Sequence, residues 1–104
     1  MLAQVYSLKG QSRIDEILKE GRKKQSDNFG VIFIDKGNED LPKFAFIISK
    51  KISRLAVNRN RVKRAMSESV RRNIDKFPKG TEVVFLAKKS IVRRSTNEIM
   101  EEVQ

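Results

Sequence analysis

Apolar residues recur along this chain with two different spacings, and each spacing predicts a kind of element. Within 12–20 they recur at helical intervals, and Gly21 follows as a residue suited to end a helix. The residues of this apolar stripe are Ile14, Ile17 and Leu18. Shorter apolar runs bounded by turn residues are typical of β-strands. The predicted strands are 29–35, 43–49 and 81–87.

The segment 58–74 has a clear helical pattern. Asn58 is suited to be its N-cap, because its side chain can accept a hydrogen bond from a free backbone N–H of the first turn. A rotation of about 100° per residue places one set of residues on a face about 140° wide, which we expect to pack on the core. This face consists of Val62, Ala65, Met66, Ser69 and Val70. On the outward face, Glu68 is spaced to pair with Arg72.

Two capping-box patterns predict where further helices begin. Ser12 with Asp15 opens the first predicted helix. Ser95 with Glu98 opens a short last helix, which ends the chain at Gln104. We expect the apolar side of this last helix to be formed by Ile99 and Val103.

The order of these elements predicts the fold class. Polar 22–28 can include a short edge strand, and the strand 43–49 is apolar on both faces, so we expect it to be covered on both sides. The connections are a turn at 36–42, a basic loop at 50–57 and a turn at 77–80. An α+β fold follows, with a mixed sheet of about four strands and helices packed on it. A chain of 104 residues suits a single domain over 1–104.

Composition excludes several kinds of chemistry. The chain has no Cys and no His, so disulfides, thiolate metal sites, a histidine base and a histidine-ligated zinc are all ruled out. No apolar run approaches the roughly 20 residues of a membrane span, and the N-terminus lacks the apolar region of a signal peptide. We therefore expect a cytoplasmic protein with no membrane partner, monomeric when free, that binds no cofactor by itself.

The net charge of +10 is concentrated in one segment. Residues 50–72 hold nine basic side chains and one acid, a net charge of +8, which leaves +2 for the other 81 residues. Such a concentration favours a polyanionic partner, with nucleic acid first and an anionic membrane surface second.

The position of these cations on the predicted helix supports a nucleic-acid partner. Four cations lie in the first two turns of the predicted helix, whose N-terminal partial positive charge disfavours cations. They are Arg59, Arg61, Lys63 and Arg64. A bound phosphate reverses this effect, because both the guanidinium groups and the free N–H groups attract it. Asn60, between two arginines, can bond a base edge, a 2′-hydroxyl or a neighbouring side chain. A merely solvated polar face is the alternative interpretation.

The stretch ISKKISRLAVNRNRVKRAMSES resembles the signature of bacterial ribonuclease P protein subunits, in which Ser-Lys-Lys ends a strand and Arg-Asn-Arg-aliphatic-Lys-Arg opens a helix. The segments SRIDEILKEGRK, NFGVIFID and KGTEVVFLAKK resemble the family's first helix and neighbouring strands. The candidate RNA-binding residues are Ser49, Lys50, Lys51, Arg54, Asn58, Arg59, Asn60, Arg61, Lys63 and Arg64.

The resemblance implies a fold with a left-handed strand–helix–strand crossover, whereas the general rule favours right-handed ones. It implies that the chain binds ribonuclease P RNA and precursor tRNA, and that the RNA, using Mg²⁺, removes the 5′ leader without a catalytic group from the protein. It also implies a cleft for the single-stranded leader between the first helix and the sheet. Ile14 and Leu18 stand where the first helix usually shows Phe, Ile32 stands where a strand Tyr is common, and Phe29 and Phe33 are the nearby aromatic candidates.

Three other functions share some of these features. A ribosomal or other structured-RNA binding protein has the same charge but no role in cleavage. A DNA-binding regulator with a recognition helix requires another helix directly before 58–74, and the pattern predicts none there. A nuclease acting alone needs a base or nucleophile pair, and the sequence offers none.

Overall fold

A four-stranded mixed sheet with helices on both of its faces forms the structure of the chain. This is a computed structural model, and it describes residues 4–49 and 51–103. The helices are α1 (Gln11–Glu20), α2 (Ala56–Arg72) and α3 (Thr96–Val103), with 3₁₀ helices η1 (Gln4–Tyr6), η2 (Ile74–Lys76) and η3 (Lys89–Arg93). The strands are β1 (Arg22–Gln25), β2 (Phe29–Asp35), β3 (Lys43–Ile47) and β4 (Thr81–Ala87). The predicted α+β class and the edge strand after the first helix are confirmed.

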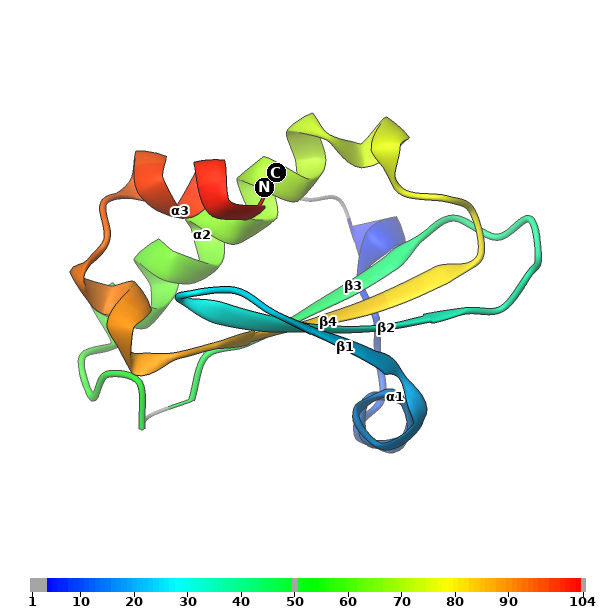
Figure 1. The fold of residues 1–104 in the computed structure, drawn as a ribbon, viewed down its shortest axis with the longest axis horizontal. Helices are drawn as coiled ribbons and strands as arrows, with labels where there is room; N and C mark the ends of the chain where they lie inside the picture. The colour runs from blue at the N-terminus through cyan, green and yellow to red at the C-terminus, as the bar shows by residue number, and fades with distance from the viewer. Residues whose placement is uncertain (1–3, 50, 104) are drawn as a thin grey trace.

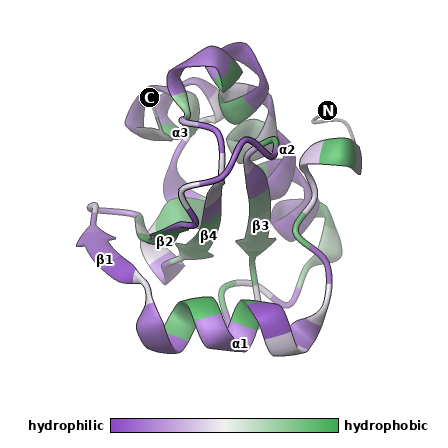
Figure 2. Ribbon diagram, turned by 90° about the vertical axis from the view of Figure 1, so that its right-hand side faces the viewer, coloured by the Kyte–Doolittle hydropathy of each residue, from purple (hydrophilic) through white to green (hydrophobic). Residues whose placement is uncertain are grey.

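The strand order in the sheet is β1-β2-β4-β3. The pairs β1–β2 and β2–β4 are antiparallel, whereas β3 and β4 are parallel and are joined through α2. This β3–α2–β4 crossover is left-handed, as Figures 1 and 2 show together, so the unusual hand implied by the sequence resemblance is confirmed.

Alternation along the strands divides the core into two clusters. Since successive side chains of a strand point to opposite faces, Val83 and Phe85 of β4 face α2 and α3, while Val84 between them faces α1. Helix α1 lies alone on its side of the sheet in Figure 1. Its Ile17 is fully buried against Ile32 and Val84 in the smaller cluster.

The turn from α1 into β1 depends on a close backbone approach at Gly21. A side chain there would place its Cβ 2.6 Å from the Ile17 carbonyl oxygen and 2.7 Å from Ile32 Cγ2. A glycine is therefore required for α1 to end here, as the sequence predicted, and to lie this close to the sheet.

Two sequence predictions about helix starts are wrong, and one is confirmed. Helix α1 begins at Gln11 after Gly10, without a side-chain cap, so the pattern at Ser12 is not a capping box. Helix α2 begins at Ala56 after Leu55, two residues before the predicted cap at Asn58. The last capping box does form, because the Glu98 amide donates to Ser95 Oγ (3.2 Å) and the Ser95 amide donates to Glu98 Oε1 (3.1 Å).

The strand β3 is shorter than its sequence predicted, and most of its side chains are only partly shielded from solvent. It ends at Ile47 rather than at 49, and it lies at an edge of the sheet. Only Phe44 is buried, while the other apolar side chains remain partly exposed. Both faces are covered as predicted, because Phe44 and Phe46 pack on the α2 side and Ala45 and Ile47 pack on the α1 side.

Candidate nucleic-acid interface

Helix α2 presents its basic side chains because its apolar face is fixed in the core. Val62, Met66 and Val70 are fully buried against the sheet. The whole predicted core face is buried, and Ser67 joins it. The rotation of the helix is thereby fixed, which decides which cations reach solvent.

The first turn of α2 is fastened to the loop before it by a serine. Ser53 Oγ accepts hydrogen bonds from the Leu55 amide (3.2 Å) and from the side-chain amide of Asn58 (3.3 Å). Asn58 therefore holds the loop instead of capping the helix. Neither a side-chain cap nor an acidic residue occupies this first turn.

Two arginines of the motif donate to backbone carbonyls. Arg59 donates to the Ser53 carbonyl (2.8 Å), and Arg61 donates to the carbonyls of Val92 (2.8 Å) and Arg94 (2.9 Å). A guanidinium group has five N–H donors, so each of these side chains keeps donors for another ligand. Arg61 in particular ties the end of η3 to α2.

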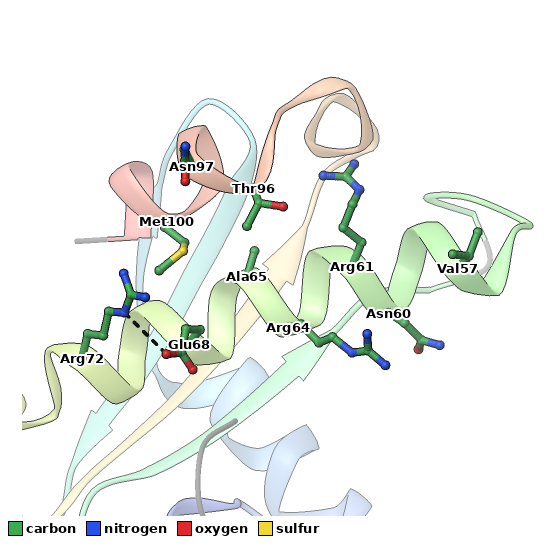
Figure 3. Close-up of a pocket in the computed structure, with 10 residues that line it drawn as sticks. All are labelled: Val57, Asn60, Arg61, Arg64, Ala65, Glu68, Arg72, Thr96, Asn97 and Met100. Atoms are coloured by element: carbon green, nitrogen blue, oxygen red, sulfur yellow. Dashed lines mark ion pairs between the residues drawn. The ribbon is translucent and has the colours of Figure 1, made fainter.

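The next two cations of the motif are available to a ligand. Lys63 and Arg64 are exposed, and their side chains form no hydrogen bond or ion pair with the residues that the structure describes. Asn60 is exposed beside them, and in Figure 3 Asn60 and Arg64 point away from α3 while Arg61 points toward η3. The motif therefore divides into arginines that also hold the fold and cations that face solvent.

A groove with a volume of about 900 Å³ lies between α2 and α3 (Figure 3). Its sides carry three arginines and one carboxylate, a net charge of +2, above an apolar floor. The lining residues are Val57, Asn60, Arg61, Arg64, Ala65, Glu68, Arg72, Thr96, Asn97 and Met100. Such a groove can receive an anionic backbone along α2.

Glu68 supplies the negative charge of this groove. It pairs with Arg71, and with Arg72 at 3.4 Å as the sequence predicted. Hydrogen bonding from Arg71, with the charges of both arginines, lowers the pKa of Glu68 to about 2. The carboxylate is therefore ionised at any physiological pH and opposes a phosphate in the groove.

More cations gather at the end of the sheet from which α2 starts. Because β3 and β4 are parallel, the segments that follow them lie at the same end, as Figure 1 shows for η3 and the loop before α2. Ser49, Lys51 and Arg54 of that loop are exposed, and Lys50 lies outside the described residues. Lys89, Arg93 and Arg94 come from the other segment. The sequence analysis did not assign these three residues to the interface. A signal was present, because β3 and β4 are each followed by basic residues, and parallel pairing brings the segments after them to the same end of the sheet.

The residues proposed from sequence for a second cleft do not lie together. Ile14 and Leu18 pack on the α1 side of the sheet with Ile32. Phe29 and Phe33 belong to the cluster on the α2 side. Strand alternation explains this correction, since Ile32 and Phe33 are neighbours in β2 and must face opposite ways. The α1 side is therefore lined by aliphatic side chains at these positions.

Two further findings concern membrane spans and metal ligands. In residues 4–49 and 51–103, no helix has the length and apolar character needed to cross a bilayer. In the same part of the chain, no three acidic side chains are grouped in a way that could hold a metal ion.

Comparisons with known proteins agree with this geometry. A sequence model of the family described as Ribonuclease P matches residues 2–104. A ribonuclease P protein component from Clostridium kluyveri is 32% identical over 102 residues, which cover 96% of this chain and 89% of that protein. Another, from Fusobacterium nucleatum, is 39% identical over 62 residues, which cover 60% of this chain and 55% of that protein, about half its length.

A solved structure shares the fold. The ribonuclease P protein from Thermotoga maritima superposes with a TM-score of 0.81 at 27% identity, over 93% of this chain and 90% of that one. The sheet and the helices described above are therefore found in an experimentally determined protein.

Proposed function

Since the chain belongs to the ribonuclease P protein family, we propose that it is the protein subunit of ribonuclease P and binds the catalytic RNA of that enzyme through α2. One observation carries this proposal. The exposed Lys63 and Arg64 stand beside Arg61 one to two turns into a helix that has no acid in its first turn. A phosphate backbone that follows this half of α2 meets these side-chain donors and, at the first turn, the positive end of the helix.

The role of the protein in this proposal is binding and not bond cleavage. The chain supplies no His or Cys for acid–base or nucleophilic chemistry. We assign hydrolysis of precursor tRNA to the RNA with its bound Mg²⁺, as the family resemblance implies, and place the complex in the cytoplasm. Replacing an exposed carboxylate, as in Asp75→Asn, should then leave cleavage by the assembled enzyme unchanged.

The single-stranded 5′ leader is proposed to contact the α1 side of the sheet. Ile14 and Leu18 are partly buried there beside Ile32, so the surface is apolar but has no aromatic ring at these positions. Aliphatic contacts give less base stacking than rings do. We therefore expect the leader to add less affinity than the α2 contacts with the RNA subunit.

Reconstitution tests this function. The protein is combined with a bacterial ribonuclease P RNA at low Mg²⁺, and 5′ maturation of a precursor tRNA is measured with and without it. We expect stimulation by the wild type, strong loss in Arg64→Glu, and little loss in Lys19→Glu, which makes the same charge change on the exposed side of α1.

Two results would contradict the proposal in different ways. Tight binding of the RNA without stimulation of cleavage would indicate a structured-RNA binding protein with no role in processing. Equal behaviour of the two charge-reversal variants would show that α2 is not the docking surface.

A further inference from the structure

A second groove, of about 450 Å³, lies on the α2-facing side of the sheet, at the end opposite to η3. It is formed by the second half of β2, the first half of β4 and the segment that leads into β4. Its lining residues are Lys24, Val31, Phe33, Asp35, Phe77, Pro78, Thr81, Val83 and Phe85. The volume is within the range of about 300–1,000 Å³ typical of ligand pockets.

Two of the three aromatic rings of this groove are held in place by contacts with other rings. Phe77 meets Phe44 edge-on, with ring centroids 4.8 Å apart. Phe85 stacks on Phe46 at 5.3 Å with an interplanar angle of 10°. Phe33 and Phe77 remain partly exposed. The groove thus offers preformed ring surfaces to a flat apolar group.

The edge of the groove is positively charged. The ammonium group of Lys24 lies 5.9 Å from the centre of the Phe33 ring. All of β1 is exposed, it appears hydrophilic along its length in Figure 2, and strand alternation places Arg22 on the same face as Lys24. These two cations form no ion pair with any described residue. The carboxylate of Asp35 instead accepts a hydrogen bond from the amide of Gly37 (2.8 Å).

We infer that this groove binds an unpaired base of single-stranded RNA, with the adjoining phosphate on Lys24. A base presents an apolar face to rings and joins it to an anionic backbone, which matches a groove of aromatic side chains beside unpaired cations. The inference rests on the proposed RNA-binding function. It adds a site on the sheet face opposite to the α1 side proposed for the leader.

The register of β1 provides a matched pair of variants. Lys24 lies opposite Val31, whose side chain packs on the α2 side, and Lys23 lies opposite Ile32, whose side chain packs on the α1 side. Lys23→Glu and Lys24→Glu therefore make the same charge change on the same exposed strand, but on different faces of the sheet. Phe33→Leu removes a ring from the groove while keeping an apolar side chain.

The test is the affinity of the full chain for a labelled oligoadenylate, measured by fluorescence anisotropy, with thermal melting to check folding. We expect Lys24→Glu and Phe33→Leu each to lower the affinity for oligoadenylate by about five-fold or more. Lys23→Glu should lower it by less than about half of that factor. In amide NMR spectra of the wild type, we expect the signals of Val31 and Val83 to shift during the titration. These spectra locate the site even if Phe33→Leu lowers stability.

Other results would overturn the inference. One is that the chain does not bind oligoadenylate. Another is that Lys23→Glu loses as much affinity as Lys24→Glu, or more. A third is that the amide signals that shift belong only to α1 or α2. Ribonuclease P RNA binding by the same proteins is measured alongside. If that binding persists and still depends on Arg64, the second site fails while the proposed function stands; if it is absent, the proposed function itself fails.

Discussion

Arg61 combines two roles that the sequence alone does not separate. Arg61 lies in the second turn of α2, so from the helix dipole alone its removal should stabilise the fold by at most a few tenths of a kcal/mol. The hydrogen bonds to the Val92 and Arg94 carbonyls act in the opposite direction and are stronger. Arg61 therefore stabilises the junction of α2 and η3 and keeps donors for a further ligand, which we propose to be RNA.

We predict that Arg61→Ala lowers the free energy of unfolding by about 1–2 kcal/mol, because two charge-assisted hydrogen bonds are lost. Arg64→Ala is the control: it is exposed and unpaired within the described residues, so stability should change by less than about 0.5 kcal/mol. Both variants should lose about ten-fold in RNA affinity. Chemical denaturation and filter binding measure the two effects, and an unchanged stability in Arg61→Ala would show that its carbonyl bonds contribute nothing.

Glu68 places a negative charge in the groove between α2 and α3, beside the surface that we propose for RNA. Since its carboxylate is ionised at neutral pH, we predict that Glu68→Gln raises RNA affinity about two- to three-fold at low salt. The gain should shrink as salt screens the groove. Glu101→Gln, an exposed change of the same kind on α3, should have a smaller effect. Weaker binding by Glu68→Gln would mean that the carboxylate positions its arginines for RNA.

Among the elements, α3 packs on α2 through the buried Ile99 and Met100, and a carboxylate fastens its far end to the sheet. Glu102 accepts hydrogen bonds from Ser26 Oγ (2.5 Å), the Asn28 amide (2.9 Å) and Asn28 Nδ2 (2.5 Å). These bonds fasten α3 to the turn between β1 and β2. Burial alone raises the pKa of Glu102, but the hydrogen bonds from Ser26 and Asn28 outweigh it and lower the pKa.

The lowered pKa of Glu102 makes the stability of the fold depend on pH. A folded-state pKa below the unfolded value gives stability that is complete above about pH 4.5 and is lost as pH falls through the lowered pKa. We predict that Glu102→Gln destabilises the protein by about 1–2 kcal/mol at neutral pH and weakens this loss in acid. Hydrogen exchange of α3 amides measures the loss of stability at neutral pH, and the free energy of unfolding measured at decreasing pH shows the change in acid. Equal effects in the exposed Glu101→Gln would refute the specific role of Glu102.

Local patterns were sufficient to predict most elements, but not their partners. Periodicity identified the buried face of α2, and the capping box at Ser95 forms as predicted. The start of α2 was missed because Ser53 holds the loop through side-chain bonds that compete with a cap at Asn58. The partner of Arg61 could not be predicted, since Val92 lies 31 positions away and meets it only through the crossover.

At the scale of the molecule, charge is gathered on one end and one edge of the sheet. We predict a log–log slope of RNA affinity against salt of about −3 to −5, at roughly −0.7 to −0.9 per phosphate contact. The Lys63→Ala and Arg64→Ala variants should each make this slope shallower by about one contact, whereas Lys19→Ala should leave it unchanged. Binding titrations over a range of salt concentrations measure this slope for the wild type and the three variants. A slope near zero would contradict docking through phosphates.

The central place of β4 has a consequence for how the chain folds during synthesis. It pairs with β2 on one side and β3 on the other, yet it is the last strand to be made. Lys43 of β3 pairs with Glu82, 39 positions later, and such distant pairing is slow to form. Until β4 leaves the ribosome, the nascent chain can form the β1–β2 hairpin and α2, but β3 has no strand to pair with. We expect the charge of the basic segment between β3 and β4 to keep this unfinished, partly apolar chain in solution until β4 completes the sheet.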